Sequence, residues 1–87
     1  MNDNYKYTAL KAVIDRGMQL MQGNVSEDLF LLWLKYSQSI LEQIANGTTF
    51  HINYLQVILG TMNTSIEPYQ KLSMCLKYLI NILPLIK

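Results

Sequence analysis

Residues 26–46 constrain the fold of this 87-residue chain more than any other stretch, because they combine a helix start, an amphipathic pattern and a helix stop. Asn24 and Glu27 have the spacing of a capping box, and Ser26 is a competing N-cap. Glu27 and Asp28 lie in the first turn, where the helix dipole favours negative charge. The stretch also contains the only tryptophan, Trp33. It predicts a long helix against which the rest of the chain packs.

On a helical wheel, this helix has one broad apolar arc and one polar arc. The apolar arc consists of Leu29, Phe30, Trp33, Leu34, Tyr36, Ile40, Leu41 and Ile44, with Ser37 inside it. Leu31 falls within the polar arc, and Leu32 lies at its edge. Single exposed leucines are common on protein surfaces, whereas two adjacent ones on a small domain suggest a contact with another protein.

Residues 5–22 also show helical spacing, before a break at residues 23–25. The inner face of this helix is expected to consist of Leu10, Val13, Ile14, Gly17, Met18 and Met21. Gly17 costs about 1 kcal/mol relative to alanine inside a helix, so it is either tolerated or lets another helix come close. Gly23 is expected to end the first helix as its C-cap, and Gly47 to end the second in the left-handed conformation.

Residues 49–62 fit two structures. Read as a strand, residues 50–54 alternate apolar and polar side chains, and residues 48–58 are rich in β-branched and aromatic types. Read as a helix capped by Thr48 or Thr49, the segment has a wide apolar face. That face consists of Phe50, Tyr54, Leu55, Ile58, Leu59 and Met62. The helix is favoured, because the segment is long for a strand and a lone hairpin would have no second strand to pair with.

The last helix is expected over residues 68–83. Pro68 suits the first turn and biases Glu67 away from helical angles. Thr64 has capping-box spacing with Glu67, and Ser65 is an alternative cap. The core stripe is expected to be Leu72, Cys75, Leu76, Leu79, Ile80 and Leu83. Tyr78 and Ile82 widen the apolar arc of this helix, and Leu85 and Ile86 form an apolar tail.

The fold is therefore predicted to be all-α. The whole chain, residues 1–87, is expected to form a single domain. Its helices cover about 5–22, 26–46, 49–62 and 68–83, connected by short loops as an antiparallel four-helix bundle, or as three long helices plus one short helix.

The charge content is low for so small a domain. The chain is 51% hydrophobic and 15% charged, with a net charge of +1, whereas a typical soluble domain is about 25% charged. Small domains often need a disulfide, a metal or self-association as additional stabilisation. Cys75 is the only cysteine and His51 the only histidine, so no internal disulfide, metal site or cofactor is expected and both side chains are read as packing residues. Self-association is the source of stability that is left.

Several function classes are disfavoured. The sequence contains no nucleotide-binding, metallopeptidase, redox or hydrolase motif, and nothing offers a nucleophile, a base and an orienting group, so an enzyme is not expected. A DNA-binding helical domain ranks third and nucleic acid is not expected, because no helix carries more than three basic residues. No apolar run is long enough to span a membrane. No secretory signal pattern is visible, and a cytoplasmic location is expected.

Three motifs resemble a known kind of protein. Leu10–Gly17 (LKAVIDRG), Leu32–Lys35 (LWLK) and Ile40–Ile44 (ILEQI) are similar to the helical accessory region of prokaryotic abortive-infection and other defence-associated proteins. In that region a segment L-K-x-L-I-x-x-G precedes a tryptophan-containing helix ending in L-L-E-x-I, and residues 69–83 resemble its final helix. The sequence departs from the pattern at residues 18–21, which replace acidic residues, and in lacking an effector domain. The resemblance implies an interaction or assembly module and brings no catalytic residue.

The expected function is a non-catalytic protein–protein interaction module that forms a homodimer through apolar faces of the second and fourth helices. The candidate interface residues are Leu31, Leu32, Tyr78, Ile82, Leu85 and Ile86. The alternative is a small inhibitor or immunity-type protein of phage or bacterial origin that binds one heterologous protein as a monomer.

Overall fold

The computed structural model describes residues 5–86, which form four α-helices and a short 3-10 helix. The elements are α1 (Tyr5–Met21), α2 (Glu27–Ala45), α3 (Thr49–Met62), α4 (Pro68–Ile82) and η1 (Leu83–Leu85). No strand occurs within residues 5–86. The predicted all-α four-helix bundle is confirmed, and each predicted helix end lies within one residue of the observed end.

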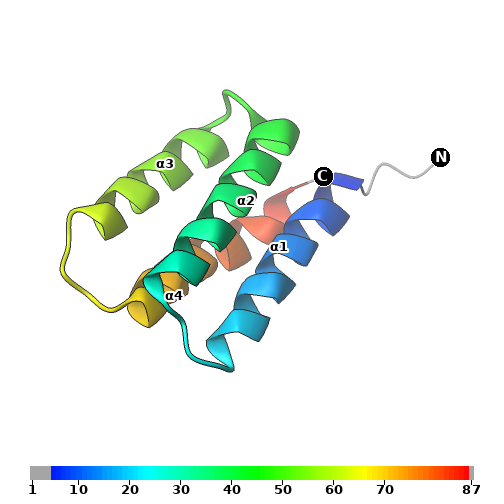
Figure 1. Cartoon of the computed structure of the whole chain (residues 1–87). Helices are drawn as coiled ribbons and strands as arrows, with labels where there is room; N and C mark the ends of the chain where they lie inside the picture. The colour runs from blue at the N-terminus through cyan, green and yellow to red at the C-terminus, as the bar shows by residue number, and fades with distance from the viewer. Residues whose placement is uncertain (1–4, 87) are drawn as a thin grey trace.

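Helices α2 and α4 form the centre of the bundle. Each of them contacts α1, α3 and the other, whereas the described parts of α1 and α3 do not touch. Figure 1 shows α1, α2 and α3 side by side, with α4 behind them. The outer side of α2 therefore lies between two flanking helices, and a groove runs along each of its flanks.

The helix starts follow from local chemistry. Ser26 caps α2, because its Oγ accepts a hydrogen bond from the Leu29 N–H at 3.1 Å, so Ser26 rather than Asn24 is the N-cap. Thr48 caps α3 in the same way. The cap of α4 is neither Thr64 nor Ser65 but Glu67, which forms a capping box with Gln70. Pro68 explains this correction, because it holds the residue before it in an extended conformation and so places the helix start there.

Gly47 and Gly23 end their helices in different backbone conformations. Gly47 follows α2 with φ +79°, as predicted for a left-handed stop. Gly23 follows α1, and its N–H donates to the Leu20 carbonyl at 3.1 Å. Among the glycines of the described chain, however, only Gly47 has a positive φ. Gly23 therefore ends α1 through a tightened last turn rather than through the left-handed conformation.

The core is narrower than the apolar arcs predict. Met18, Ile80, Leu59 and Met62 were expected inside but are exposed. Leu29 and Tyr36 of α2 are exposed as well, although the wheel places them in the apolar arc. Each helix is covered only where a neighbouring helix meets it. An apolar arc wider than that contact leaves its edges at the surface.

Trp33 holds α1, α2 and α4 together at Gly17. The Trp33 indole Nε1 donates a buried hydrogen bond to the Val13 carbonyl at 2.9 Å. A Cβ on Gly17 would lie 2.8 Å from Leu76 Cδ2 and 3.0 Å from Trp33 Cε2. Gly17 is thus required for close helix packing, the second of its two predicted roles.

Two glycine substitutions test this packing. Gly17→Ala should lower the free energy of unfolding by about 1 kcal/mol, because the added methyl group overpacks the contact with Trp33 by more than the gain in helix propensity. The matched control is Gly60→Ala within α3, where a Cβ would meet no atom within 4 Å. That variant should be more stable by about 0.5–1 kcal/mol. Urea unfolding measures both, and equal stabilisation by the two substitutions would contradict the assigned role of Gly17.

Candidate functional site

The buried polar side chains serve the fold. Tyr54 and Ser37 are fully buried, and their hydroxyl oxygens lie 2.6 Å apart. Because the Ser37 hydroxyl donates to the Leu34 carbonyl at 2.8 Å, the Tyr54 hydroxyl must be the donor to Ser37 Oγ. No buried side-chain polar atom within residues 5–86 lacks a hydrogen-bond partner. This network joins α2 to α3.

Neither Cys75 nor His51 belongs to a reactive cluster in the described chain. Cys75 is fully buried, and burial raises the pKa of its thiol to about 11. His51 is half-buried in the first turn of α3. Within residues 5–86, no group of three His, Cys, Asp or Glu side chains is arranged to hold a metal ion. The surface, rather than the interior, therefore contains the candidate site.

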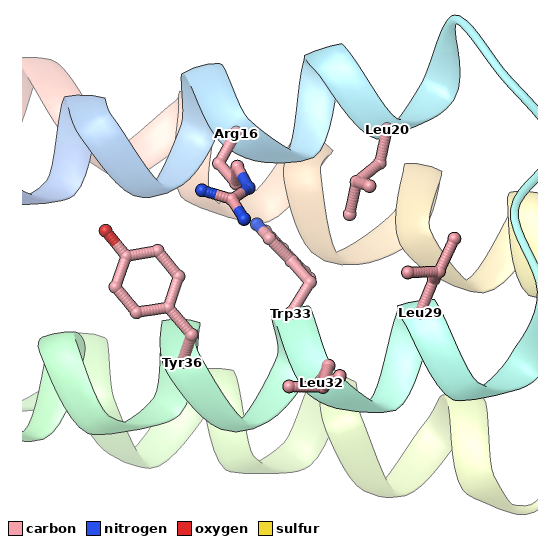
Figure 2. A pocket seen from close by; sticks show the side chains of 6 residues that line it. All are labelled: Arg16, Leu20, Leu29, Leu32, Trp33 and Tyr36. Atoms are coloured by element: carbon pink, nitrogen blue, oxygen red, sulfur yellow. The ribbon is translucent and has the colours of Figure 1, made fainter.

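The first surface feature is the α1–α2 groove, a cleft of about 370 Å³. It is lined by Arg16, Leu20, Leu29, Leu32, Trp33 and Tyr36. Figure 2 shows Arg16 and Leu20 extending from α1, and the guanidinium group of Arg16 lying between Tyr36 and Trp33. Leu32 is 69% exposed at the edge of the groove. The groove thus offers an apolar surface with one cationic group beside it.

The second feature is the α2–α3 groove, of about 430 Å³, on the opposite flank of α2. Its lining residues are Lys35, Gln38, Ser39, Glu42, His51 and Leu55. Leu31 continues the same stripe of α2, four residues before Lys35. Along the outer side of α3, Ile52 is 51% exposed and Leu59 is 60% exposed. We call these residues together the α2–α3 face.

The structure separates the six predicted interface residues into two groups. Leu31, Leu32 and Leu85 are exposed. Ile82 and Ile86 are 5% and 8% exposed and belong to the core, so their expected surface position is wrong. Ile82 lies on the same buried side of α4 as Cys75 and Leu79. Ile86 follows η1, which packs against α1 and α4. The helical wheel of α4 does not include the contact between η1 and α1.

Tyr78 is also placed differently from the expectation. Its ring stacks on Tyr54 with 5.7 Å between ring centroids, and its hydroxyl donates to the Phe50 carbonyl at 2.7 Å. Tyr78 is therefore a partly buried link between α3 and α4, not an exposed interface anchor. The six residues do not form one patch, because α2 and the end of the chain contribute exposed leucines to different sides.

Sequence reasoning missed the contributions of Arg16, Leu29 and Tyr36 to the α1–α2 groove. The available signal was the spacing of Leu29, Leu32 and Tyr36, which places them on one stripe of α2. The wheel assigned Leu29 and Tyr36 to the core, because it does not show how far α1 covers α2. The contribution of Arg16 depends on the packing of α1 and has no sequence signature.

Comparison with protein-family models, with curated proteins and with solved structures found no match. Among residues 5–86, the structure contains no helix with the length and apolar character required to cross a bilayer.

The buried thiol and phenol predict a decrease in stability at alkaline pH. Burial raises the pKa of Cys75 from 9.0 to about 11 and holds the pKa of Tyr54 well above its ordinary value. The unfolded chain therefore loses these protons at lower pH than the folded chain does. The contribution of these two groups to stability should be constant below about pH 9 and should fall as the pH rises towards 11.

Urea unfolding across this pH range measures the effect, and Cys75→Ala should reduce the slope. In the native protein, the Cys75 thiol should react with a disulfide reagent far more slowly than in urea. Equal reaction rates in the folded and unfolded protein would contradict the burial of Cys75.

Proposed function

We propose that this chain is a non-catalytic protein–protein interaction module that self-associates. The observation that carries the proposal is the exposed apolar surface on both flanks of α2 in a chain with few charges. Leu31 and Leu32 of α2 and Leu59 of α3 are all exposed. Apolar surface of this kind on a small domain is typical of a contact with another protein. The net charge of +1 provides little repulsion between two copies.

Size and charge support a modest, specific interface. A specific interface buries at least about 600 Å² on each partner, which is about a tenth of the 5615 Å² surface of this molecule.

The basic residues give little support to nucleic-acid binding, because they are not gathered on one face. Lys11 pairs with Asp15, and Lys71 pairs with Glu27. A free cysteine buried in the core is compatible with the proposed cytoplasmic location.

Self-association predicts a concentration-dependent mass. Size-exclusion chromatography with light scattering should give a mass that rises from one chain to two as the concentration increases. Leu31→Lys should weaken association about tenfold without changing helicity, because Leu31 lies at the edge of the α2–α3 face. Asn81→Lys adds the same charge on the exposed side of α4 and is the control. A chain that stays monomeric at all concentrations would rule out self-association.

The α1–α2 groove supports a second candidate function. An amphipathic helix of a different protein could place apolar side chains on Leu20, Leu29 and Leu32, and a carboxylate beside Arg16. This is the mode of action expected of a small inhibitor or immunity-type protein of phage or bacterial origin. The resemblance to helical regions of defence-associated proteins is compatible with either function and stays a prediction.

Selection from a displayed peptide library tests whether the α1–α2 groove binds a partner peptide. Peptides selected on the wild-type chain should combine large apolar residues with an acidic residue. Selection on Arg16→Glu should instead yield a basic residue at the same place, because the charge of the groove is reversed. Selection on Lys77→Glu, which makes the same change on the exposed side of α4, is the control. Identical selected sequences for all three proteins would contradict binding at the groove.

A further inference from the structure

The α2–α3 face has the charge pattern of a twofold interface. We infer that two copies of the chain associate through this face, with the α2 helices antiparallel, so that Lys35 of each copy pairs with Glu42 of the other. The twofold axis passes beside Gln38 and Leu55. The inference rests on the proposed self-association and specifies its surface and symmetry.

The first observation concerns the charged residues Lys35 and Glu42 of α2. Lys35 and Glu42 both line the α2–α3 groove and are both exposed. They are seven residues apart on one stripe, about 10 Å along the helix, which is too far for an ion pair within one chain. Neither takes part in the two ion pairs found within residues 5–86. In two antiparallel α2 helices centred between residues 38 and 39, each Lys35 lies opposite a Glu42.

The exposed apolar side of α3 can also pair with itself in an antiparallel arrangement. Ile52, Leu55 and Leu59 have the i, i+3, i+7 spacing of a helix–helix seam. Residues 49–62 contain no Asp, Glu, Lys or Arg, so no like charges oppose the approach of a second α3. In an antiparallel pair centred near Leu55, each Ile52 meets a Leu59 and the two Leu55 side chains meet at the axis.

A single twofold axis can relate both the two α2 helices and the two α3 helices. The pair formed by Lys35 and Glu42 is centred beside Gln38, and the apolar pair is centred beside Leu55. Gln38 and Leu55 line the same groove from opposite sides. The buried hydrogen bond between Ser37 and Tyr54 fixes this level of α2 against α3. A twofold interface requires one patch to be complementary to itself, and the α2–α3 face meets this condition in the charges of α2 and in the apolar spacing of α3.

The α1–α2 groove is not complementary to itself in charge. Its charged residue is Arg16, and the nearest acidic residue along the chain, Asp15, already pairs with Lys11 at 3.0 Å. Asp15 lines the adjoining cleft, but no acidic residue lines the α1–α2 groove itself to pair with the Arg16 of a second copy. In a dimer formed through the α2–α3 face, the α1–α2 groove lies on the other flank of α2 and stays open.

A charge swap tests the ion pairs. Lys35→Glu should raise the dissociation constant of the dimer about tenfold, because two attractive pairs become repulsive. Glu42→Lys should do the same. The double variant Lys35→Glu/Glu42→Lys should restore wild-type association, because both pairs form again with reversed polarity. Lys77→Glu on α4 is the control for net charge and should leave the dissociation constant unchanged.

A cysteine at the axis tests the symmetry. Leu55→Cys should form a disulfide-linked dimer under mild oxidation, because the introduced thiol of one copy meets the same thiol of the other. Asn53→Cys, on a different side of α3, should not. The native Cys75 does not compete, because it is fully buried. Far-UV circular dichroism confirms that each variant is folded.

The outcomes separate the interface from the proposed self-association. A dimer whose dissociation constant is unaffected by Lys35→Glu, or is not restored by the charge swap, overturns the α2–α3 interface and leaves self-association standing. A wild-type chain that is monomeric at every concentration overturns both.

Discussion

The contact between Trp33 and Gly17 is the constraint on which the rest of the structure depends. The indole donates to the Val13 carbonyl, and the missing side chain of Gly17 makes room for the ring and for Leu76 of α4. Three helices therefore meet closely at one point. A Cβ at position 17 would force the Leu76 side chain and the Trp33 ring to shift, and Trp33 also lines the groove between α1 and α2.

The position of α2 explains why a chain with so few charges has two different surfaces. α4 covers its inner side, while α1 and α3 cover only its flanks. The flank towards α1 exposes leucine and tyrosine, and the flank towards α3 exposes Lys35 and Glu42. One helix thus supports the core and divides the outer surface into an apolar groove with a cation and a groove with balanced charge. This division is what allows a second copy and a different partner to be proposed for separate sites.

The buried hydrogen bond between Tyr54 and Ser37 has a comparable role for α3. It sets the level at which α3 packs on α2, and the stacked ring of Tyr78 joins the same residue to α4. α3 contains no Asp, Glu, Lys or Arg, so these two contacts and a few apolar side chains determine how it is oriented. The exposed side of α3 combines Ile52 and Leu59 with the uncharged polar residues Asn53 and Gln56.

Local sequence alone determined the limits of the helices to within one residue, because caps, glycine stops and apolar spacing act within one or two turns. For residues 49–62 the local pattern fitted both a strand and a helix. Local sequence also identified Leu31 and Leu32 as exposed leucines of α2. Only the tertiary structure decided how far each apolar arc is covered, which moved Ile82 and Ile86 into the core and Leu29 and Tyr36 to the surface. The grooves belong to this second group, since each is lined by two helices whose packing is set by Gly17 and Tyr54. A periodic pattern shows which side of a helix is apolar, but the neighbouring helices determine how much of that side is removed from water.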